Sequence, residues 1–351
     1  MRDRKRSSRS PRRWTGFSIC ETPYDEGLIV AGAGIIGLSC AWRLSQKGHR
    51  VTVFDAGRAG AEASWAGAGM LAPGGEYEEG GEIARMAVES LRRYPEFVRE
   101  LEAESGLGID FRQCGAIEAG DEEELTRRAA EQAAVGIGSS PFSYRGRTAR
   151  FYSDDAVVDP RHVTKALAVA CAKRGVVLRE NEAIARVLDD GRAVQTASGT
   201  HEGAGVLIAA GAWSSALFPG LRRTMPVRGH LIAWRKQKGF LEPILRDRKT
   251  YLLQRSSGWL IAGSTTEHAE FDRNIDEDAV EDIRRRAVAL LPELGGDPPD
   301  ERWNGFRPGI EGDAPAIGRV EGTRVWMAFG HYRNGILLAP ATADRIAASV
   351  S

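Results

Sequence analysis

Three glycines, Gly32, Gly34 and Gly37, form a Gly-x-Gly-x-x-Gly motif that can hold the phosphates of a dinucleotide. Gly32 permits a tight turn, Gly34 lets a pyrophosphate approach the backbone, and Gly37 lets a helix pack closely on a strand. The free N–H groups at the start of that helix add a partial positive charge. Asp55 follows 18 residues after Gly37, where its carboxylate can accept hydrogen bonds from ribose hydroxyls. These residues predict a dinucleotide site.

The elements around these glycines occur in the order that such a site requires. An apolar strand over 28–31 precedes the motif, a helix follows through Leu44, and a second strand covers 51–54. A glycine motif can arise by chance in a chain with 41 glycines, but the flanking elements make a turn that only packs the weaker interpretation. The motif leaves FAD and NAD open, whereas the acid at Asp55 disfavours the 2′-phosphate of NADP.

The composition excludes several classes of protein. Among 351 residues, 48 Lys and Arg balance 48 Asp and Glu, so no net charge attracts nucleic acid or an anionic membrane. The cysteines, Cys20, Cys40, Cys114 and Cys171, form no Cys-x-x-Cys pair, which argues against a zinc site and a disulfide framework. No apolar run reaches the roughly 18 residues of a membrane span. We expect a cytoplasmic protein with reduced thiols and no metal.

The first residues differ from the rest of the chain. Residues 1–13 hold seven Lys or Arg and one acid, so we expect residues 1–23 to form a disordered basic arm. Arg12 and Arg13 superficially suggest a twin-arginine signal, but polar residues such as Glu21 interrupt the apolar segment that should follow. We interpret this segment as a mis-assigned start or an inert tail rather than as a targeting signal.

Downstream of Asp55, helical patterns follow a stretch of small residues. Small residues over 60–75 surround Trp65 and Met70, which indicates backbone that approaches a flat ligand closely. Helical periodicity spans 83–104, and Pro95 is expected to begin a second helix there. These segments follow the first βαβ unit directly.

Strand and turn signals complete the pattern. Alternation predicts a strand over 110–119, and Asp189, Asp190 and Gly191 predict a hairpin turn. We expect a discontinuous nucleotide-binding α/β domain over 24–80, 150–215 and 302–351, and a strand-rich domain over 81–149 and 216–301. The other predicted elements are helices over 122–134, 163–173, 276–291 and from 336 onward, and strands over 176–178, 205–210, 231–234, 251–253, 259–262 and 325–329.

Four motifs occur in one order along the chain: GAGIIG at 32–37, AGMLAP at 68–73, GFRPG at 305–309 and GHYRNGILLAPAT at 330–342. This set resembles the glycine oxidases of thiamine biosynthesis, which belong to the D-amino-acid oxidase superfamily of FAD enzymes. The resemblance extends from about Leu28 to the C-terminus. It implies an α/β fold in which a Rossmann-like FAD-binding domain carries a strand-rich α+β substrate domain.

The resemblance also implies contacts with FAD along the chain. The phosphates are expected at 35–36, the ribose at 55–56, the flavin end at 63–70, a backbone contact at Val187 and the isoalloxazine ring at 331–337. The implied cofactor-binding residues are Gly32, Gly34, Ile35, Ile36, Gly37, Asp55, Ala56, Ala63, Ser64, Ala68, Gly69, Met70, Val187, His331, Tyr332, Arg333, Asn334, Gly335, Ile336 and Leu337.

Three residues match substrate-contacting positions of the family: Arg307, Arg333 and Tyr251. A guanidinium group such as that of Arg307 can bind a carboxylate through two parallel hydrogen bonds. The simpler interpretations are a structural ion pair for either arginine and a core aromatic side chain for Tyr251. His331 lies in a glycine-flanked turn, where it more simply positions backbone near the flavin than serves as a base.

The resemblance implies the reaction as well. A small amino acid binds with a neutral amine, its Cα hydrogen passes as hydride to flavin N5, and O2 reoxidises the flavin to give hydrogen peroxide. The N-terminus of the helix beginning near Ile336 is placed to stabilise negative charge on the flavin. From glycine, the imine product would feed thiazole synthesis. We expect no nucleic-acid or membrane partner, and a homo-oligomer remains possible.

Several departures from the family leave the preferred substrate open. Tyr332 replaces a commoner Phe, Phe306 a commoner Leu, Gln254 a frequent Pro, and Thr266 stands where some relatives have Met. Glycine, sarcosine and small D-amino acids all remain candidates. The alternatives are a D-amino-acid dehydrogenase that reduces a quinone, an FAD enzyme that oxidises a modified uridine in tRNA, a flavoprotein without activity and an NAD dehydrogenase.

Overall fold

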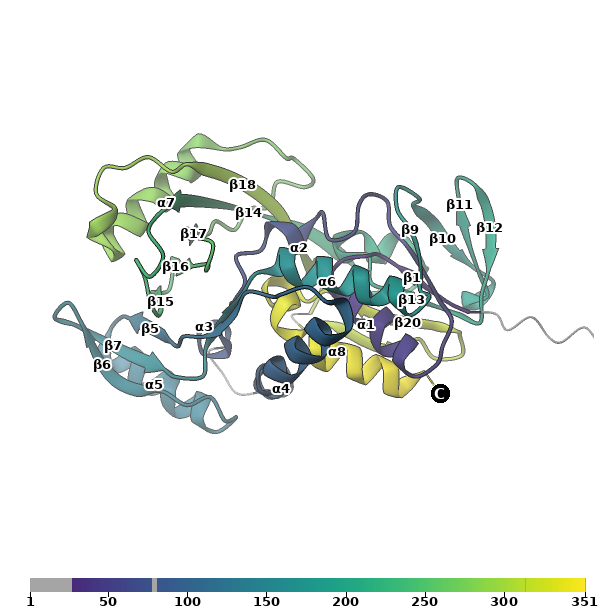
Figure 1. Ribbon diagram of the computed structural model, residues 1–351, viewed down its shortest axis with the longest axis horizontal. Coiled ribbons are helices and arrows are strands. Elements are labelled where there is room, and N and C mark those ends of the chain that lie inside the picture. The colour runs from purple at the N-terminus through teal and green to yellow at the C-terminus, as the bar shows by residue number, and fades with distance from the viewer. Residues whose placement is uncertain (1–26, 78–80, 313, 351) are drawn as a thin grey trace, which may run out of the picture.

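The computed structural model describes residues 27–77, 81–312 and 314–350. The predicted basic arm over 1–23 and Cys20 lie outside these residues. Two large sheets dominate the fold, an eight-stranded sheet toward the left of Figure 1 and a six-stranded sheet toward the right. Over the described parts of the chain, no helix is both long enough and apolar enough to cross a membrane.

The six-stranded sheet has the order β19-β20-β13-β1-β2-β9 and is parallel except where β19 meets β20. In β1, Leu28 and Val30 pack into one core while Ile29 and Ala31 pack into another. A parallel strand covered on both faces requires such an apolar run. The strands are β1 (Leu28–Ala31), β2 (Val51–Phe54), β9 (Val177–Arg179), β13 (Gly205–Ile208), β19 (Ala316–Arg319) and β20 (Val325–Phe329).

Helices cover one face of this sheet and a small antiparallel sheet covers the other. The 3-10 helix η1 (Asp189–Gly191) turns the chain between β10 and β11, so the predicted hairpin is confirmed. The covering elements are helices α1 (Ile35–Gln46), α4 (Glu82–Ser105), α6 (Pro160–Lys173) and α8 (Gly335–Ser349), and strands β10 (Ile184–Leu188), β11 (Ala193–Thr196) and β12 (Gly199–Glu202).

Helix α4 differs from its prediction in two ways. It continues through Pro95 as one helix, and it packs in the core of the six-stranded sheet rather than in the strand-rich domain. Its apolar face, which includes Met86 and Phe97, is buried with α6 and α8, and the Tyr94 hydroxyl donates to the Ile336 carbonyl at 2.7 Å. This packing outweighs the roughly 3 kcal/mol that an interior proline costs a helix.

The eight-stranded sheet has the order β18-β14-β17-β16-β15-β5-β7-β6. Strand β18, expected in the nucleotide-binding domain, instead pairs along its whole length with β14. The elements are strands β5 (Ala116–Ala119), β6 (Ser140–Tyr144), β7 (Arg147–Tyr152), β14 (Thr224–Arg235), β15 (Ile244–Arg246), β16 (Tyr251–Gln254), β17 (Trp259–Gly263) and β18 (Glu301–Ile310), with helices α5 (Glu122–Ala133) and α7 (Glu277–Leu290).

The single strand predicted over 110–119 is two strands in different sheets. Gly115 has a φ of +72° and breaks the segment, so that the first part pairs with β8 and the second joins the large sheet. The remaining elements are β3 (Met70–Leu71), β4 (Phe111–Gln113), β8 (Ala156–Val158), α2 (Ala63–Ala66), α3 (Pro73–Glu76), η2 (Gly211–Ala216), η3 (Pro292–Leu294) and η4 (Tyr332–Asn334).

A cluster of buried charged side chains surrounds Arg246 of the eight-stranded sheet. Arg246 on β15 donates to Glu118 at 2.9 Å and to Asp155 at 2.6 Å, and Arg128 on α5 also donates to Glu118. Burial raises the pKa of Asp155 to about 6, although the charge of Arg246 opposes the shift. Two cations and two acids therefore balance one another within the domain, so that Arg246 brings no excess charge.

Candidate active site

A cavity of about 640 Å³ lies at the carboxyl ends of β1 and β2. The position agrees with the rule that ligands of open α/β sheets bind beyond the carboxyl ends of the parallel strands. Most of the predicted cofactor-binding residues meet at this cavity although they come from distant parts of the chain. Those that line it are Gly32, Gly34, Ile35, Ile36, Asp55, Ala56, Ala63, Ser64, His331, Tyr332, Arg333, Gly335 and Ile336.

The three motif glycines have distinct surroundings. Gly32 has a φ of +108°, and a Cβ there would lie 2.5 Å from the Ala209 carbonyl oxygen. A Cβ on Gly37 would lie 1.9 Å from the Gly32 carbonyl oxygen, so helix and turn touch there. At Gly34 the nearest atom to a Cβ is the Ser64 hydroxyl at 3.5 Å. Gly34 therefore leaves space for a ligand, whereas Gly32 and Gly37 permit internal packing.

The carboxylate of Asp55 is oriented by the backbone. One oxygen accepts from the Ala33 N–H at 2.7 Å and the other from the Gly57 N–H at 2.8 Å. Each oxygen retains a lone pair for a ribose hydroxyl, because a carboxylate accepts about four hydrogen bonds. The glycine turn, the helix start at Ile35 and this held acid fit a dinucleotide cofactor such as FAD.

Not every predicted cofactor residue lines this cavity. Val187 is not among the residues that line it, and its N–H donates to the Leu217 carbonyl at 2.8 Å, whereas Ala183, Ile184 and Ala185 line the cavity. The chain meets Asp55 between β9 and β10, where the Asp55 N–H donates to the Arg179 carbonyl at 3.0 Å and the Glu182 N–H donates to the Asp55 carbonyl at 2.8 Å. The others lie elsewhere: Leu337 in the helical core, Asn334 beside the Tyr77 hydroxyl, and Ala68, Gly69 and Met70 on a second cavity.

The second cavity, of about 360 Å³, contains all three predicted substrate-contacting residues, Arg307, Arg333 and Tyr251. It shares part of its wall with the first cavity, so the two are neighbours. A redox-active ring at the end of the first cavity would therefore face a small molecule in the second. The shared residues are Ala63, Gly67, Phe306, Tyr332, Arg333 and Ile336.

The Arg307 side chain extends from β18 across Gly229 of β14. A Cβ on Gly229 would lie 2.3 Å from the guanidinium, so only glycine leaves room for this arrangement. The guanidinium donates to the Ser264 hydroxyl at 2.6 Å and to the Thr265 carbonyl at 3.0 Å. Burial lowers the pKa of Arg307, which remains a cation at neutral pH because its ordinary value is so high. Two neutral acceptors, the Ser264 hydroxyl and the Thr265 carbonyl, therefore hold the positively charged, fork-shaped guanidinium of Arg307 in place.

Three further groups set the charge around Arg307. Burial raises the pKa of Tyr251, so its hydroxyl is a neutral donor. Burial also raises the pKa of the Glu76 carboxyl, while the charges of Arg333, Arg307 and Arg246 oppose that shift. Arg333 donates to the Thr266 hydroxyl at 3.1 Å. The guanidinium groups of Arg307 and Arg333 therefore give this part of the pocket a positive charge, which suits a carboxylate.

Sequence reasoning missed Glu76 and Ser264. Glu76 follows the predicted AGMLAP motif by three residues, so its proximity to that motif was the available signal. Ser264 directly follows β17, and strand ends commonly place side chains at sites, but nothing local links it to Arg307.

His331 is buried and lies against α8, where its Nε2 is 3.0 Å from the Thr342 hydroxyl. Burial lowers its pKa to about 3, so the ring is neutral at physiological pH. A base this weak takes up no proton from a substrate near neutral pH. The geometry therefore agrees with a role in placing the backbone of the turn, as expected from its sequence context.

His331 should make the protein less stable in acid. Because its folded pKa of about 3 lies below the ordinary 6.5, only the unfolded chain gains this proton as the pH falls through that interval. The unfolding free energy should fall by about 1.4 kcal/mol per pH unit from this group. We expect the unfolding free energy, measured with urea between pH 4 and 6, to change less steeply with pH in His331→Gln than in the wild type, by about one proton. An unchanged slope would contradict the assignment; exposed His268→Gln provides the control.

Comparisons with known proteins agree with this geometry. A family model described as FAD dependent oxidoreductase matches residues 28–349. The chain is 34% identical to the glycine oxidase of Pseudomonas putida over 334 residues, 90% of this chain and 92% of that protein. It is 33% identical to the bifunctional protein ThiO/ThiG of Synechocystis, over 91% of this chain and 50% of that protein.

A solved structure shows the same likeness. The crystal structure of glycine oxidase from Geobacillus kaustophilus matches with a TM-score of 0.87 at 28% identity, over 93% of this chain and 94% of that one. Together with the two observed sheets, these similarities confirm the predicted fold class.

Proposed function

The chain belongs to the FAD-dependent oxidoreductase family, and on that premise we propose that it oxidatively deaminates glycine. The observation that carries the proposal is the shared wall between the cavity of the glycine motif and the cavity that contains Arg307. Membership of the family decides for FAD over NAD as cofactor. The cationic side chains of Arg307 and Arg333 on the wall of the second cavity support a substrate that carries a carboxylate.

The residues of the pocket bind and orient the substrate in this proposal. Arg307 grips the carboxylate through its fork, and the neutral hydroxyl of Tyr251 donates a further hydrogen bond. Arg333 closes the side of the pocket that adjoins the first cavity. This placement turns the Cα–H bond toward the shared wall. When bound there, FAD supplies the hydride acceptor, and the N–H groups that begin α8 supply positive potential beside it.

The proposed overall reaction converts glycine, water and O2 to glyoxylate, ammonia and hydrogen peroxide. A cavity of about 360 Å³ also admits sarcosine and small D-amino acids, and the Thr266 and Phe306 side chains on its wall would set the preference. The likeness to a ThiO/ThiG protein supports a role in forming the thiazole of thiamine. The free thiols Cys40, Cys114 and Cys171 support action in the cytoplasm.

Anaerobic absorbance of the purified protein tests the proposal. A bound oxidised flavin should bleach on addition of glycine and recover in air with formation of hydrogen peroxide. Bleaching without recovery in air, but with recovery on a quinone, would favour a dehydrogenase instead. A flavin unaffected by glycine, sarcosine and D-alanine would contradict the proposed activity and direct attention to a modified uridine in tRNA.

A further inference from the structure

The short segment from Ser264 to Thr266 contacts all three predicted substrate-binding residues. Ser264 accepts from Arg307 and interacts with the Tyr251 hydroxyl, and the Thr265 carbonyl accepts from Arg307 at 3.0 Å. The Thr266 hydroxyl accepts from Arg333 at 3.1 Å. The segment lies just beyond the end of β17, outside regular strand pairing. Its position therefore determines where both guanidinium groups point.

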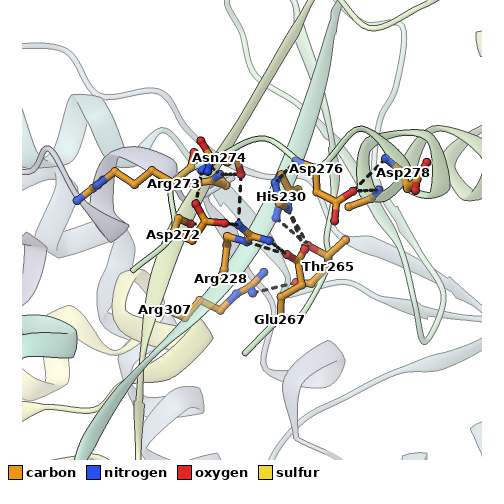
Figure 2. Close-up of polar contacts among 12 residues, drawn as sticks. Arg228, His230, Thr265, Glu267, Asp272, Arg273, Asn274, Asp276, Asp278 and Arg307 are labelled. Carbon is orange, nitrogen blue, oxygen red and sulfur yellow. Dashed lines mark hydrogen bonds and ion pairs between the residues drawn. The ribbon is translucent and has the colours of Figure 1, made fainter. Parts of the chain in front are cut away.

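A group of polar side chains holds this segment from the side away from the pocket. The Thr265 hydroxyl accepts from the backbone N–H of His230 at 2.9 Å and itself donates to the Glu267 carboxylate. His230 Nδ1 lies 2.8 Å from the same carboxylate, and Arg228 Nε donates to its second oxygen at 2.7 Å. Figure 2 shows this continuous chain of contacts, from Arg307 through Thr265 and Glu267 to His230 and Arg228.

The hydrogen bonds assign the protonation of His230. Its Nε2 accepts from the backbone N–H of Asp276 at 3.2 Å, so the proton of the neutral ring is on Nδ1, where it donates to Glu267. The ring is completely buried between the start of α7 and Glu267. Although partial burial opposes the shift, hydrogen bonds from Thr265, His230 and Arg228 lower the pKa of Glu267, which keeps it anionic.

We propose that Thr265, Glu267 and His230 are positioning residues that fix the guanidinium of Arg307 for the substrate carboxylate. The inference rests on the proposed function, because it assigns these residues to the pocket in which glycine is bound. None of the three lines the cavity, so they act through the Ser264–Thr266 segment. The pairing of a guanidinium with a carboxylate depends on geometry. If the contacts that hold Arg307 are lost, the affinity for the substrate carboxylate falls although the charge of Arg307 remains.

The alternative is that these contacts only stabilise the loop between β17 and α7. Arg228 donates to Asp272 at 2.8 Å and to the Asn274 carbonyl at 3.3 Å, and these bonds hold the loop but do not reach Arg307. A purely structural role predicts lower thermal stability with unchanged affinity for carboxylates. A positioning role predicts lower affinity for carboxylates, with a smaller effect on thermal stability. Carboxylate affinity and unfolding must therefore be measured on the same variants.

The test uses the FAD-loaded protein and acetate, whose binding is followed by the change in flavin absorbance. Thr265→Val removes the hydroxyl at nearly constant volume, and Glu267→Gln removes the charge. Both should raise the dissociation constant of acetate and the KM for glycine by about tenfold, with kcat changed by less than about threefold. Thr265→Ser, which keeps the hydroxyl, should restore values close to those of the wild type.

Glu277→Gln is the matched control, because Glu277 pairs with exposed Arg302 at 3.0 Å and contacts nothing in the pocket. Wild-type acetate affinity in both Thr265→Val and Glu267→Gln would overturn the proposal, whatever their melting temperatures. Equal effects in Glu277→Gln would overturn it too. If the wild type binds acetate but does not oxidise glycine, the proposed function is refuted. The dissociation constants of acetate for the variants would then decide this inference by themselves.

Discussion

Arg307→Ala should lower kcat/KM for glycine about a thousandfold while FAD stays bound. A hydrogen bond to a charged group contributes about 1.5–3 kcal/mol, and the fork of Arg307 can make two to a carboxylate. Their loss corresponds to between about a hundredfold and ten-thousandfold. Arg307 lines only the substrate cavity, so flavin absorbance should persist. Oxygen uptake at several glycine concentrations measures the effect.

Two variants sharpen this prediction. Arg307→Lys retains the positive charge but not the fork, and should recover only part of the activity, leaving a loss of about tenfold to a hundredfold. Arg302→Ala removes another arginine from the same strand, one that pairs with exposed Glu277, and should leave kcat/KM unchanged. Nearly normal turnover in Arg307→Ala would refute the assignment of the carboxylate site.

The second large effect concerns the motif glycines, whose substitutions should fail for different reasons. In Gly37→Ala the new Cβ would lie 1.9 Å from the Gly32 carbonyl oxygen, so helix α1 must move away from the turn. We expect unfolding of the FAD-free protein to become easier by about 3 kcal/mol, as for an overpacked core. Urea unfolding measures this change in the free energy of unfolding.

Gly34→Ala should spare the fold and reduce cofactor binding. The nearest atom to its Cβ is 3.5 Å away, an ordinary contact, so the protein itself accommodates the methyl group. The methyl group instead occupies space that a pyrophosphate would need against the helix start, and FAD affinity should fall about a hundredfold. Titration of FAD into the stripped protein tests this, and equal FAD affinity in Gly34→Ala and wild type would contradict the phosphate site.

The local features of this chain were readable from its sequence because short-range sterics control them. Gly32 adopts a positive φ in the turn, and Asp159 and Pro160 form the N-cap and first position of α6. Periodicity alone predicts this helix from residue 163, whereas the Asp-Pro cap begins it at Pro160. The order of β1, α1 and β2 follows from the same kind of local rule.

The larger arrangement depended on contacts between distant residues. Helix α4 packs in the core of the six-stranded sheet and strand β18 pairs with β14, which their sequences alone do not predict, because an apolar face fits either sheet and only packing selects between them. Ala183, Ile184 and Ala185 line the first cavity because of the course that the chain takes past Asp55, while the cofactor contact expected at Val187 stays a prediction. A shift of even one residue in a strand reverses which face a side chain occupies.

The sequence by itself determined that the chain binds a dinucleotide and which residues carry the motifs, because glycine turns, caps and apolar runs act over a few residues. Only the tertiary structure decided that Ser264 and Thr265 hold Arg307 from 43 and 42 residues away, and that Glu267 and His230 stand behind them. Such contacts depend on which strands pair and in what register. Strand pairing and register minimise the free energy of the whole chain, so the sequence around each of the contacting residues does not indicate the contact.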